Sequence, residues 1–281
     1  MEFLHDDLIK QVSLLARQAG AAILSLYQHN DYQNPSKVKI KSDDSPVTEA
    51  DKLAHEIIAA ELSMLNEQYD LPAYIVSEED ESTHQAIHEN KRIDAKYIWL
   101  VDPLDGTKEF IAHTHEFSVN IALIYEHQPI LGVIYVPYYD LLYYAQVGKG
   151  AFLQTSNGEI KKLNSAASNR SASEPIRVIA SRRHGQAELS SFLPNLGDYQ
   201  IVHVGSSWKF CKIAEGLADV YVRLGPTSEW DTAAGQIILS EAGGETRDMS
   251  DGLLCYNTKL DLSNPPFIAV SQPILYTKIC G

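Results

Sequence analysis

The sequence is poor in cysteine and has no excess of basic residues. Its three cysteines, Cys211, Cys255 and Cys280, show no C-x-x-C spacing, which argues against a disulfide framework or a zinc site and favours free thiols in a reducing compartment. Lysine and arginine number 23 against 37 acidic residues, a formal net charge of −14. Because nucleic acids bind through lysine and arginine, we predict no nucleic-acid partner. A small anionic substrate stays compatible, since bound divalent cations reverse the local field.

Long apolar runs are also missing. No stretch approaches the roughly 20 apolar residues that span a bilayer, so we expect no transmembrane segment. The first seven residues carry neither the basic region nor the apolar core of a signal peptide. We therefore expect a cytoplasmic protein whose only membrane association would be peripheral, on the cytoplasmic face of the inner membrane. We also expect a monomer or a homodimer.

The hydrophobic pattern predicts an α/β protein. Apolar residues at three- and four-residue steps indicate an amphipathic helix over the first 28 residues, and a second helix opens at residues 48–51. Residues 97–101 form an entirely apolar run, typical of a central strand. Three further strands joined by tight turns follow, and strands alternate with helices beyond the polar stretch 154–174. We expect two sections, 1–154 and 155–281, the first carrying most of the acidic candidates for a site.

Three acidic segments follow strands or open helices: residues 77–80, 101–107 and 230–234. Ligand sites in α/β proteins favour the carboxyl ends of strands, and hard divalent cations favour carboxylates and backbone carbonyls. Asp102 and Asp105 converge if the chain turns at Pro103, which leaves a carbonyl such as that of Leu104 free for a metal. Gly106 permits close approach by a ligand, and the amides that follow can bind phosphate as an open helix end does.

Each segment also has a plainer interpretation. Asp-x-x-Asp in a turn is more often a solvated loop, and Asp231 could be only a helix N-cap. Asp51 could be only the acid of a capping box with Thr48, residues 78–80 a solvated turn, and residues 113–115 an exposed loop. Taken one at a time, these segments leave metal binding open.

Together the segments form a family pattern. Residues 47–51, 77–80, 99–110 and 229–235 resemble, in this order, the signatures of the inositol monophosphatase superfamily, and the resemblance runs from the first helix to Gly244. Residues 108–110, 205–211 and 221–227 are most similar to the bacterial 3'(2'),5'-bisphosphate nucleotidases within it. The resemblance implies a layered αβαβα sandwich with the site between its two sections.

The resemblance also implies a set of metal ligands. Two or three Mg²⁺ ions would be held by Glu78, Asp102, the Leu104 carbonyl, Asp105 and Asp231, with Asp51 reaching the third. Thr107, hydrogen-bonded toward Asp51 or Glu78, would orient the attacking water. The chain provides the carboxylates that a pair of cations about 4 Å apart requires to activate water and stabilise a departing oxygen.

The substrate contacts implied by the resemblance lie in both sections. The Gly106 and Thr107 amides, beside Asp231, would hold the scissile phosphate. Ser206 and Lys209 would contact a nucleotide, Arg223 would meet its second phosphate, and His184 would lie near the base.

The activity implied by the resemblance is hydrolysis of the 3'-phosphate of adenosine 3',5'-bisphosphate to AMP and phosphate, with phosphoadenosine phosphosulfate as a second substrate. An inositol monophosphatase is the alternative, for which Lys209 and Arg223 need not meet a second phosphate. A binding protein that has lost the chemistry would lack a metal ligand, and none is missing. A calcium-binding module would need a twelve-residue loop with alternating ligands, which the sequence does not contain.

Overall fold

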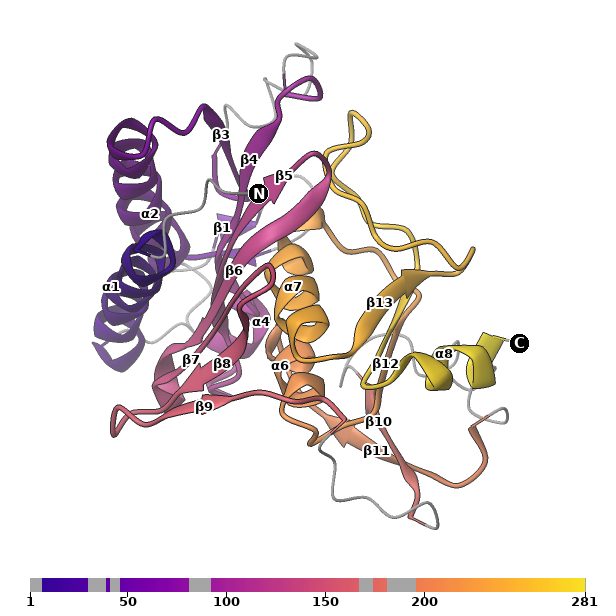
Figure 1. Cartoon of the computed structure of the whole chain (residues 1–281). Coiled ribbons are helices and arrows are strands. Elements are labelled where there is room, and N and C mark those ends of the chain that lie inside the picture. The colour runs from indigo at the N-terminus through magenta and orange to yellow at the C-terminus, as the bar shows by residue number, and fades with distance from the viewer. Residues whose placement is uncertain are drawn as a thin grey trace.

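The computed structural model describes residues 7–29, 39–40, 46–80, 92–166, 174–180 and 196–280. These residues form five layers: two helices, a seven-stranded sheet, two helices, a five-stranded sheet and a last helix (Figure 1). This is the αβαβα sandwich, and the predicted fold class is confirmed. None of the helices in these residues is long and apolar enough to cross a membrane.

The outer helical layer follows from the apolar pattern. Helix α1 (Leu8–His29) buries the stripe that includes Val12, Ala19 and Ile23 against the first sheet. Helix α2 (Glu49–Gln68) begins at the Thr48 N-cap, whose side-chain oxygen accepts from the Ala50 amide while Asp51 accepts from the Thr48 amide. The predicted capping box is confirmed, and it fixes where Asp51 stands.

The first sheet has the strand order β3-β4-β5-β6-β7-β8-β9. Strand β4 is the second strand from the edge, not the central strand that its apolar run predicted, because β3 is the edge strand. It is buried along most of its length and pairs in parallel with β3 and antiparallel with β5. Beyond the pair Asp102–Asn120 the register with β5 is interrupted until Asp105 meets Ser118. The strands are β3 (Ala73–Ser77), β4 (Tyr97–Asp105), β5 (Ser118–Tyr125), β6 (Gln128–Val136), β7 (Leu141–Gln146), β8 (Gly150–Gln154) and β9 (Ile160–Lys162); a separate two-stranded pair is β1 (Lys39–Ile40) with β2 (Pro46–Val47).

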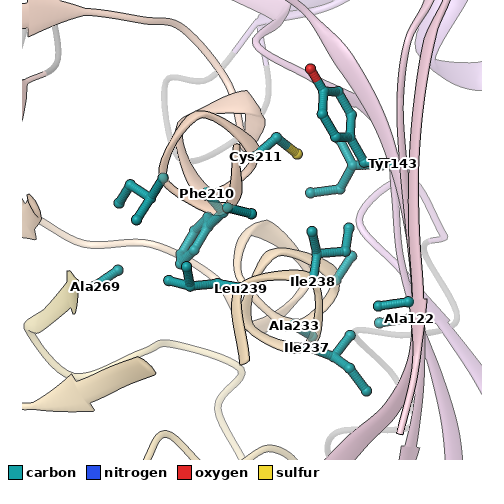
Figure 2. Close-up of a cluster of buried hydrophobic side chains, with 14 of the residues drawn as sticks. Ala122, Tyr143, Phe210, Cys211, Ala233, Ile237, Ile238, Leu239 and Ala269 are labelled. Carbon is teal, nitrogen blue, oxygen red and sulfur yellow. The ribbon is translucent and has the colours of Figure 1, made fainter. Parts of the chain in front are cut away.

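The middle layer consists of α6 (Trp208–Ala214) and α7 (Ala233–Glu241). Their apolar side chains, among them Phe210, Ile237 and Leu239, pack between the two sheets (Figure 2). Both helices approach their neighbours closely: a Cβ added at Gly132 would lie 2.5 Å from the Ile237 side chain, and one at Gly235 would lie 2.5 Å from the Phe210 ring. The site segments of both sections are thereby held against one buried core.

The second sheet has the order β11-β10-β12-β14-β13. Its outer face is covered by α8 (Pro273–Cys280), whose Leu275, Tyr276 and Ile279 join a third apolar cluster. The strands are β10 (Ile176–Ala180), β11 (Tyr199–His203), β12 (Val220–Arg223), β13 (Glu245–Asp248) and β14 (Phe267–Val270), and the short helices elsewhere are α4 (Thr107–Ile111), η2 (Pro137–Tyr139) and η4 (Glu229–Asp231).

The sequence pattern predicts a section boundary after residue 154 and helices over residues 206–216 and 231–242. Strand β9 lies beyond residue 155 and still belongs to the first sheet, so the change of sheet follows Lys162; the division into sections 1–154 and 155–281 stays a prediction. Helix α6 begins at Trp208 and not at Ser206, because Ser206 has a φ of 48° and is left-handed. Helix α7 begins at Ala233, and Asp231 ends the preceding 3-10 helix η4.

Candidate active site

The end of β4 delivers the first two carboxylates. The Asp102 side chain is 2% exposed, and its Oδ1 accepts from the Leu104 amide at 3.1 Å, in the stretch of β4 where the register with β5 is interrupted. Asp105 ends the strand, and Gly106 follows with φ 89°. A Cβ at Gly106 would lie 3.1 Å from the Glu116 carbonyl and 3.4 Å from Ser206 Cβ. Glycine therefore allows both the positive φ and the close packing of Glu116 and Ser206 against the backbone at this position.

Helix α4 then places Thr107 beside helix α2. The Thr107 hydroxyl is 3.1 Å from Asp51 Oδ1 and 3.2 Å from the Leu104 carbonyl. The Asp51 side chain is 2% exposed, and its Oδ2 accepts from both the amide and the hydroxyl of Thr48. Burial raises the pKa of Asp51 to about 7, with the charges of Glu79 and Glu78 adding to it and the Thr48 hydrogen bonds opposing it. Of the two partners expected for Thr107, the contact formed is with Asp51.

Asp105 is held by Ser207, the residue before α6, and by Asn120, in strand β5. Its Oδ2 accepts from the Ser207 amide and hydroxyl, each at 2.5 Å, and from Asn120 Nδ2 at 3.2 Å. The Ser207 hydroxyl is also 2.5 Å from the Asp231 carbonyl oxygen. The Asp105 carboxylate is therefore held beside the segment that carries Asp231.

Asp231 lies in a second capping box. Its Oδ2 accepts from the Ser228 amide at 2.8 Å, and the 3-10 helix η4 carries it toward the first section. The pKa of Asp231 is raised well above its usual range, first by burial and then by the charges of Asp105 and Glu78. The pKa of Asp102 is raised in the same way by burial, Glu78, Asp105 and then Asp231. Five acidic side chains thus share one electrostatic environment.

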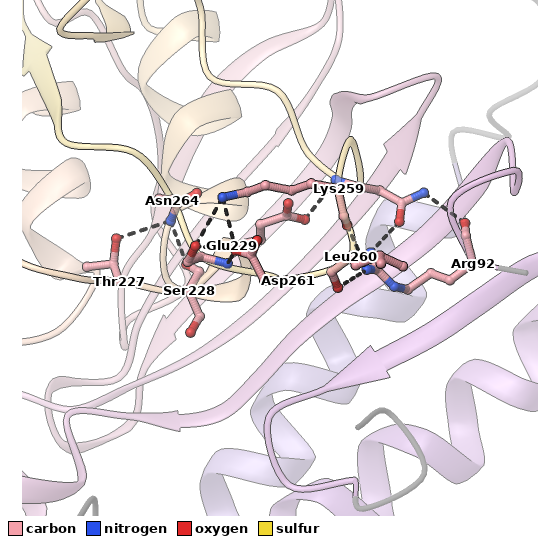
Figure 3. Close-up of polar contacts among 10 residues, drawn as sticks. Arg92, Thr227, Ser228, Glu229, Lys259, Leu260, Asp261 and Asn264 are labelled. Atoms are coloured by element: carbon pink, nitrogen blue, oxygen red, sulfur yellow. Dashed lines mark hydrogen bonds and ion pairs between the residues drawn. The ribbon is translucent and has the colours of Figure 1, made fainter. Parts of the chain in front are cut away.

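A buried network supports η4 from the far side (Figure 3). Arg92, 2% exposed, donates to Asn257 Oδ1 and to the Lys259 and Leu260 carbonyls, and the Asn257 amide donates to Glu229 Oε2 at 2.8 Å. Burial is the main cause that raises the pKa of Glu229 to about 7, with Arg92 opposing it.

Asn264 supports the same loop, because its Nδ2 lies within hydrogen-bond distance of the Thr227 hydroxyl, the Ser228 carbonyl and the Thr232 hydroxyl. This network holds the loop that ends in Asp231.

The cationic candidates meet the carboxylates at one cavity of about 100 Å³. It is lined by Asp105, Ser206, Ser207, Lys209, Phe210, Tyr221, Arg223, Thr227, Asp231 and Thr232. Lys209 Nζ donates to the Ser206 carbonyl at 2.8 Å and lies 5.6 Å from the centre of the Tyr221 ring. Arg223 donates through its Nη2 to the Pro226 carbonyl, while its buried Nε has no hydrogen-bond partner among the residues that the structure describes. Burial lowers the pKa of Lys209.

The predicted site residues are mostly brought together. Asp51, Glu78, Asp102, Leu104, Asp105, Gly106 and Thr107 gather at the β3–β4 end, and Ser206, Lys209, Arg223 and Asp231 join them from the second section. His184 lies outside the described residues. The sequence patterns did not indicate five supporting residues: Ser207, Asn120, Arg92, Asn257 and Asn264. Four of them are neutral, and Arg92 is buried. Ser207 lies in the segment 205–211, whose family resemblance is the one feature that could have indicated it.

The oxygen-only donor set fits Mg²⁺, which binds carboxylates and carbonyls. The acidic side chains are nevertheless too far apart to bind one ion together: within the part of the chain that the structure describes, no three His, Cys, Asp or Glu side chains are placed to hold one. The donors are therefore suitable in kind, and side-chain rotation would have to bring them to bonding distance.

Comparison with known proteins identifies the family. The model of the inositol monophosphatase family matches residues 5–281. The chain belongs to the inositol monophosphatase family. The family prediction is confirmed.

Relatives of the chain within the inositol monophosphatase family include bacterial proteins named 3'(2'),5'-bisphosphate nucleotidase CysQ. The protein of that name from Salmonella typhimurium is 43% identical over 92% of this chain and 98% of its own. The one from Escherichia coli K12 is 42% identical with the same coverage. The crystal structure of CysQ from Bacteroides thetaiotaomicron matches with a TM-score of 0.76 and 36% identity, over 93% of this chain and 96% of that one.

Proposed function

We propose that this protein is a magnesium-dependent phosphatase that hydrolyses the 3'-phosphate of adenosine 3',5'-bisphosphate to AMP and phosphate, and that phosphoadenosine phosphosulfate is a second substrate. The observation that carries the proposal is the cavity in which Lys209 and Arg223 face Asp105 and Asp231. A substrate with two phosphates would suit this cavity, because the metal bound by the aspartates would bind one phosphate and Lys209 with Arg223 would bind the other. The names of the CysQ relatives support the same substrate class.

Magnesium would be held by Glu78, Asp102, the Leu104 carbonyl, Asp105 and Asp231, with Asp51 within reach of a third ion. When bound, the metal supplies positive charge that activates water and stabilises the departing oxygen. Without it, five acidic groups would repel a phosphate. Burial, and after it the charges of the neighbouring carboxylates, raises the pKa values of Asp102 and Asp231, and a divalent cation would relieve that crowding of negative charge.

Thr107 is proposed to orient the attacking water. Its hydroxyl donates to Asp51 Oδ1, which leaves an oxygen lone pair to accept a hydrogen bond from water. Asp51 is buried with its pKa raised to about 7, so it is suited to take up a proton near neutral pH. Water forms the new P–O bond and gives a proton to Asp51, the bond from phosphorus to the 3'-oxygen breaks, and that oxygen takes a proton from solvent and leaves as the 3'-hydroxyl of AMP. Asp51 then returns its proton to solvent.

The Gly106 and Thr107 amides, at the start of α4, are proposed to hold the scissile phosphate. Lys209 and Arg223 would bind the 5'-phosphate, and a guanidinium can grip a phosphate in bidentate fashion. The buried Arg223 Nε, which has no hydrogen-bond partner in the described part of the chain, would gain one. Ser206 would contact the ribose side of the nucleotide, and His184 would lie near the base.

The substrate assignment is tested by phosphate release from adenosine 3',5'-bisphosphate, inositol 1-phosphate and fructose 1,6-bisphosphate with magnesium present. We expect the highest kcat/KM for the adenosine bisphosphate, with AMP as the nucleotide product. Adenosine 3'-phosphate as product would show cleavage at the wrong position. A preference for inositol 1-phosphate would favour the alternative, an inositol monophosphatase.

A further inference from the structure

The Asp105 carboxylate is held at only one of its two oxygens. Oδ2 accepts from the Ser207 amide, the Ser207 hydroxyl and Asn120 Nδ2. Among the described residues, none donates a hydrogen bond to Oδ1. A carboxylate fixed in this way keeps one oxygen for another partner, and its plane is set by the donors on the first oxygen.

The Ser207 hydroxyl joins the two carboxylate-bearing segments. It lies 2.5 Å from Asp105 Oδ2, at the end of β4, and 2.5 Å from the Asp231 carbonyl oxygen, in η4. A hydroxyl has one hydrogen, so the two acceptors share it, while its own oxygen accepts from Asn120 Nδ2 at 2.9 Å. Two segments that are 126 residues apart in the chain (231 − 105) are thereby joined through one atom.

Asn120 completes the arrangement from the neighbouring strand. Its Nδ2 donates to both Asp105 Oδ2 and the Ser207 hydroxyl, and its Oδ1 accepts from Ser118. Ser207 and Asn120 are 4% and 1% exposed. Water cannot readily replace a donor there, so deleting one leaves the carboxylate without it.

We propose that Ser207, supported by Asn120, is a positioning residue that sets the orientation of Asp105 and its separation from Asp231 for cation binding. The proposal rests on the proposed function, in which both aspartates hold magnesium. Ser207 does not touch the cation. It would fix one ligand, Asp105, beside the segment that carries Asp231, so that fewer side chains have to rotate for a cation to bind; residues behind metal ligands commonly have this role.

The test is a calorimetric titration of the full-length protein with magnesium alone, so that the readout does not depend on turnover. Ser207→Ala should weaken magnesium binding about 10- to 100-fold, the usual effect of removing a residue that supports a ligand. Asn120→Ala should weaken it in the same direction. In turnover assays, the magnesium concentration for half-maximal activity should rise, while the KM for the bisphosphate at saturating magnesium should stay the same.

Ser165→Ala is the matched control. Ser165 is fully buried, and its hydroxyl donates to the Ala242 and Ser271 carbonyls, away from the site. The same deletion of a buried hydroxyl there should leave magnesium affinity unchanged. If Ser207→Ala does not fold, the titration of Asn120→Ala decides the question.

The outcomes separate this proposal from the proposed function. Magnesium affinity in folded Ser207→Ala equal to that of the wild type, or reduced no more than in Ser165→Ala, would overturn the positioning role while leaving Asp105 as a ligand. In that case Asp105→Asn would still lose affinity. A wild-type protein that binds no magnesium would overturn both proposals.

Discussion

Replacing Arg223 by methionine should separate substrates with one phosphate from those with two. The Arg223 side chain lines the cavity beside Lys209, and none of the described residues forms a hydrogen bond with its buried Nε. A buried donor without a partner is unfavourable by about 1–3 kcal/mol, and a bound phosphate would remove that penalty. Methionine keeps much of the side-chain length and removes the charge.

The size of the effect follows from the bond that is lost. A hydrogen bond to a charged group contributes about 1.5–3 kcal/mol, and each 1.4 kcal/mol is a factor of ten. Arg223→Met should therefore lower kcat/KM for adenosine 3',5'-bisphosphate about 10- to 150-fold. Hydrolysis of inositol 1-phosphate, which lacks the second phosphate, should change by less than about threefold, under 0.7 kcal/mol.

The assay is the ratio of kcat/KM for the two substrates at saturating magnesium, before and after the substitution. A variant that keeps the wild-type unfolding midpoint excludes a general loss of structure. If both substrates lose activity equally, Arg223 supports the fold or the metal site, and the reasoning from the second phosphate is wrong.

Three further predictions follow from the site and the core. Magnesium affinity should rise with pH, because Asp102 and Asp231, whose pKa values are raised, must release protons before they bind a cation; calorimetry in two buffers of different ionisation enthalpy would detect the release, and a pH-independent affinity would contradict it. Lithium at millimolar concentration should inhibit turnover at the magnesium optimum, as the family resemblance implies, and uninhibited rates would count against it. Gly235→Ala should lower the free energy of unfolding by about 1–3 kcal/mol, because its Cβ would meet the Phe210 ring at 2.5 Å; urea denaturation would measure this, with Gly225→Ala, where the nearest atom is 3.9 Å away, as the control.

Part of the local structure of the site could be predicted from the sequence. The capping box at Thr48 and Asp51 is present, and Asp51 also receives the Thr107 hydroxyl. The plain interpretation and the functional one were therefore not alternatives, because the cap uses mainly Oδ2 and leaves Oδ1 for Thr107. The N-cap interpretation of Asp231 is wrong, because Thr232 is the N-cap of α7; Asp231 is instead the acid of the η4 capping box, and it also faces the other acids.

The supporting residues could not be read from local patterns. Ser207 and Asn120 are small neutral residues whose role arises only when β4, β5 and α6 meet. No sequence motif marks Arg92, which is buried against the loop after Tyr256. Periodicity reports which face of an element is apolar and says nothing about the strand order, so the layering came from the family resemblance.

The proposed role of these carboxylates is to bind the cation on which phosphate release depends. It is tested most directly by phosphate release from adenosine 3',5'-bisphosphate across a magnesium titration, for the wild type and Asp105→Asn. We predict no release by the chelated wild type, saturable activation by magnesium, and a loss of turnover by orders of magnitude in a folded Asp105→Asn protein. Metal-independent release, or wild-type rates in Asp105→Asn, would contradict the account.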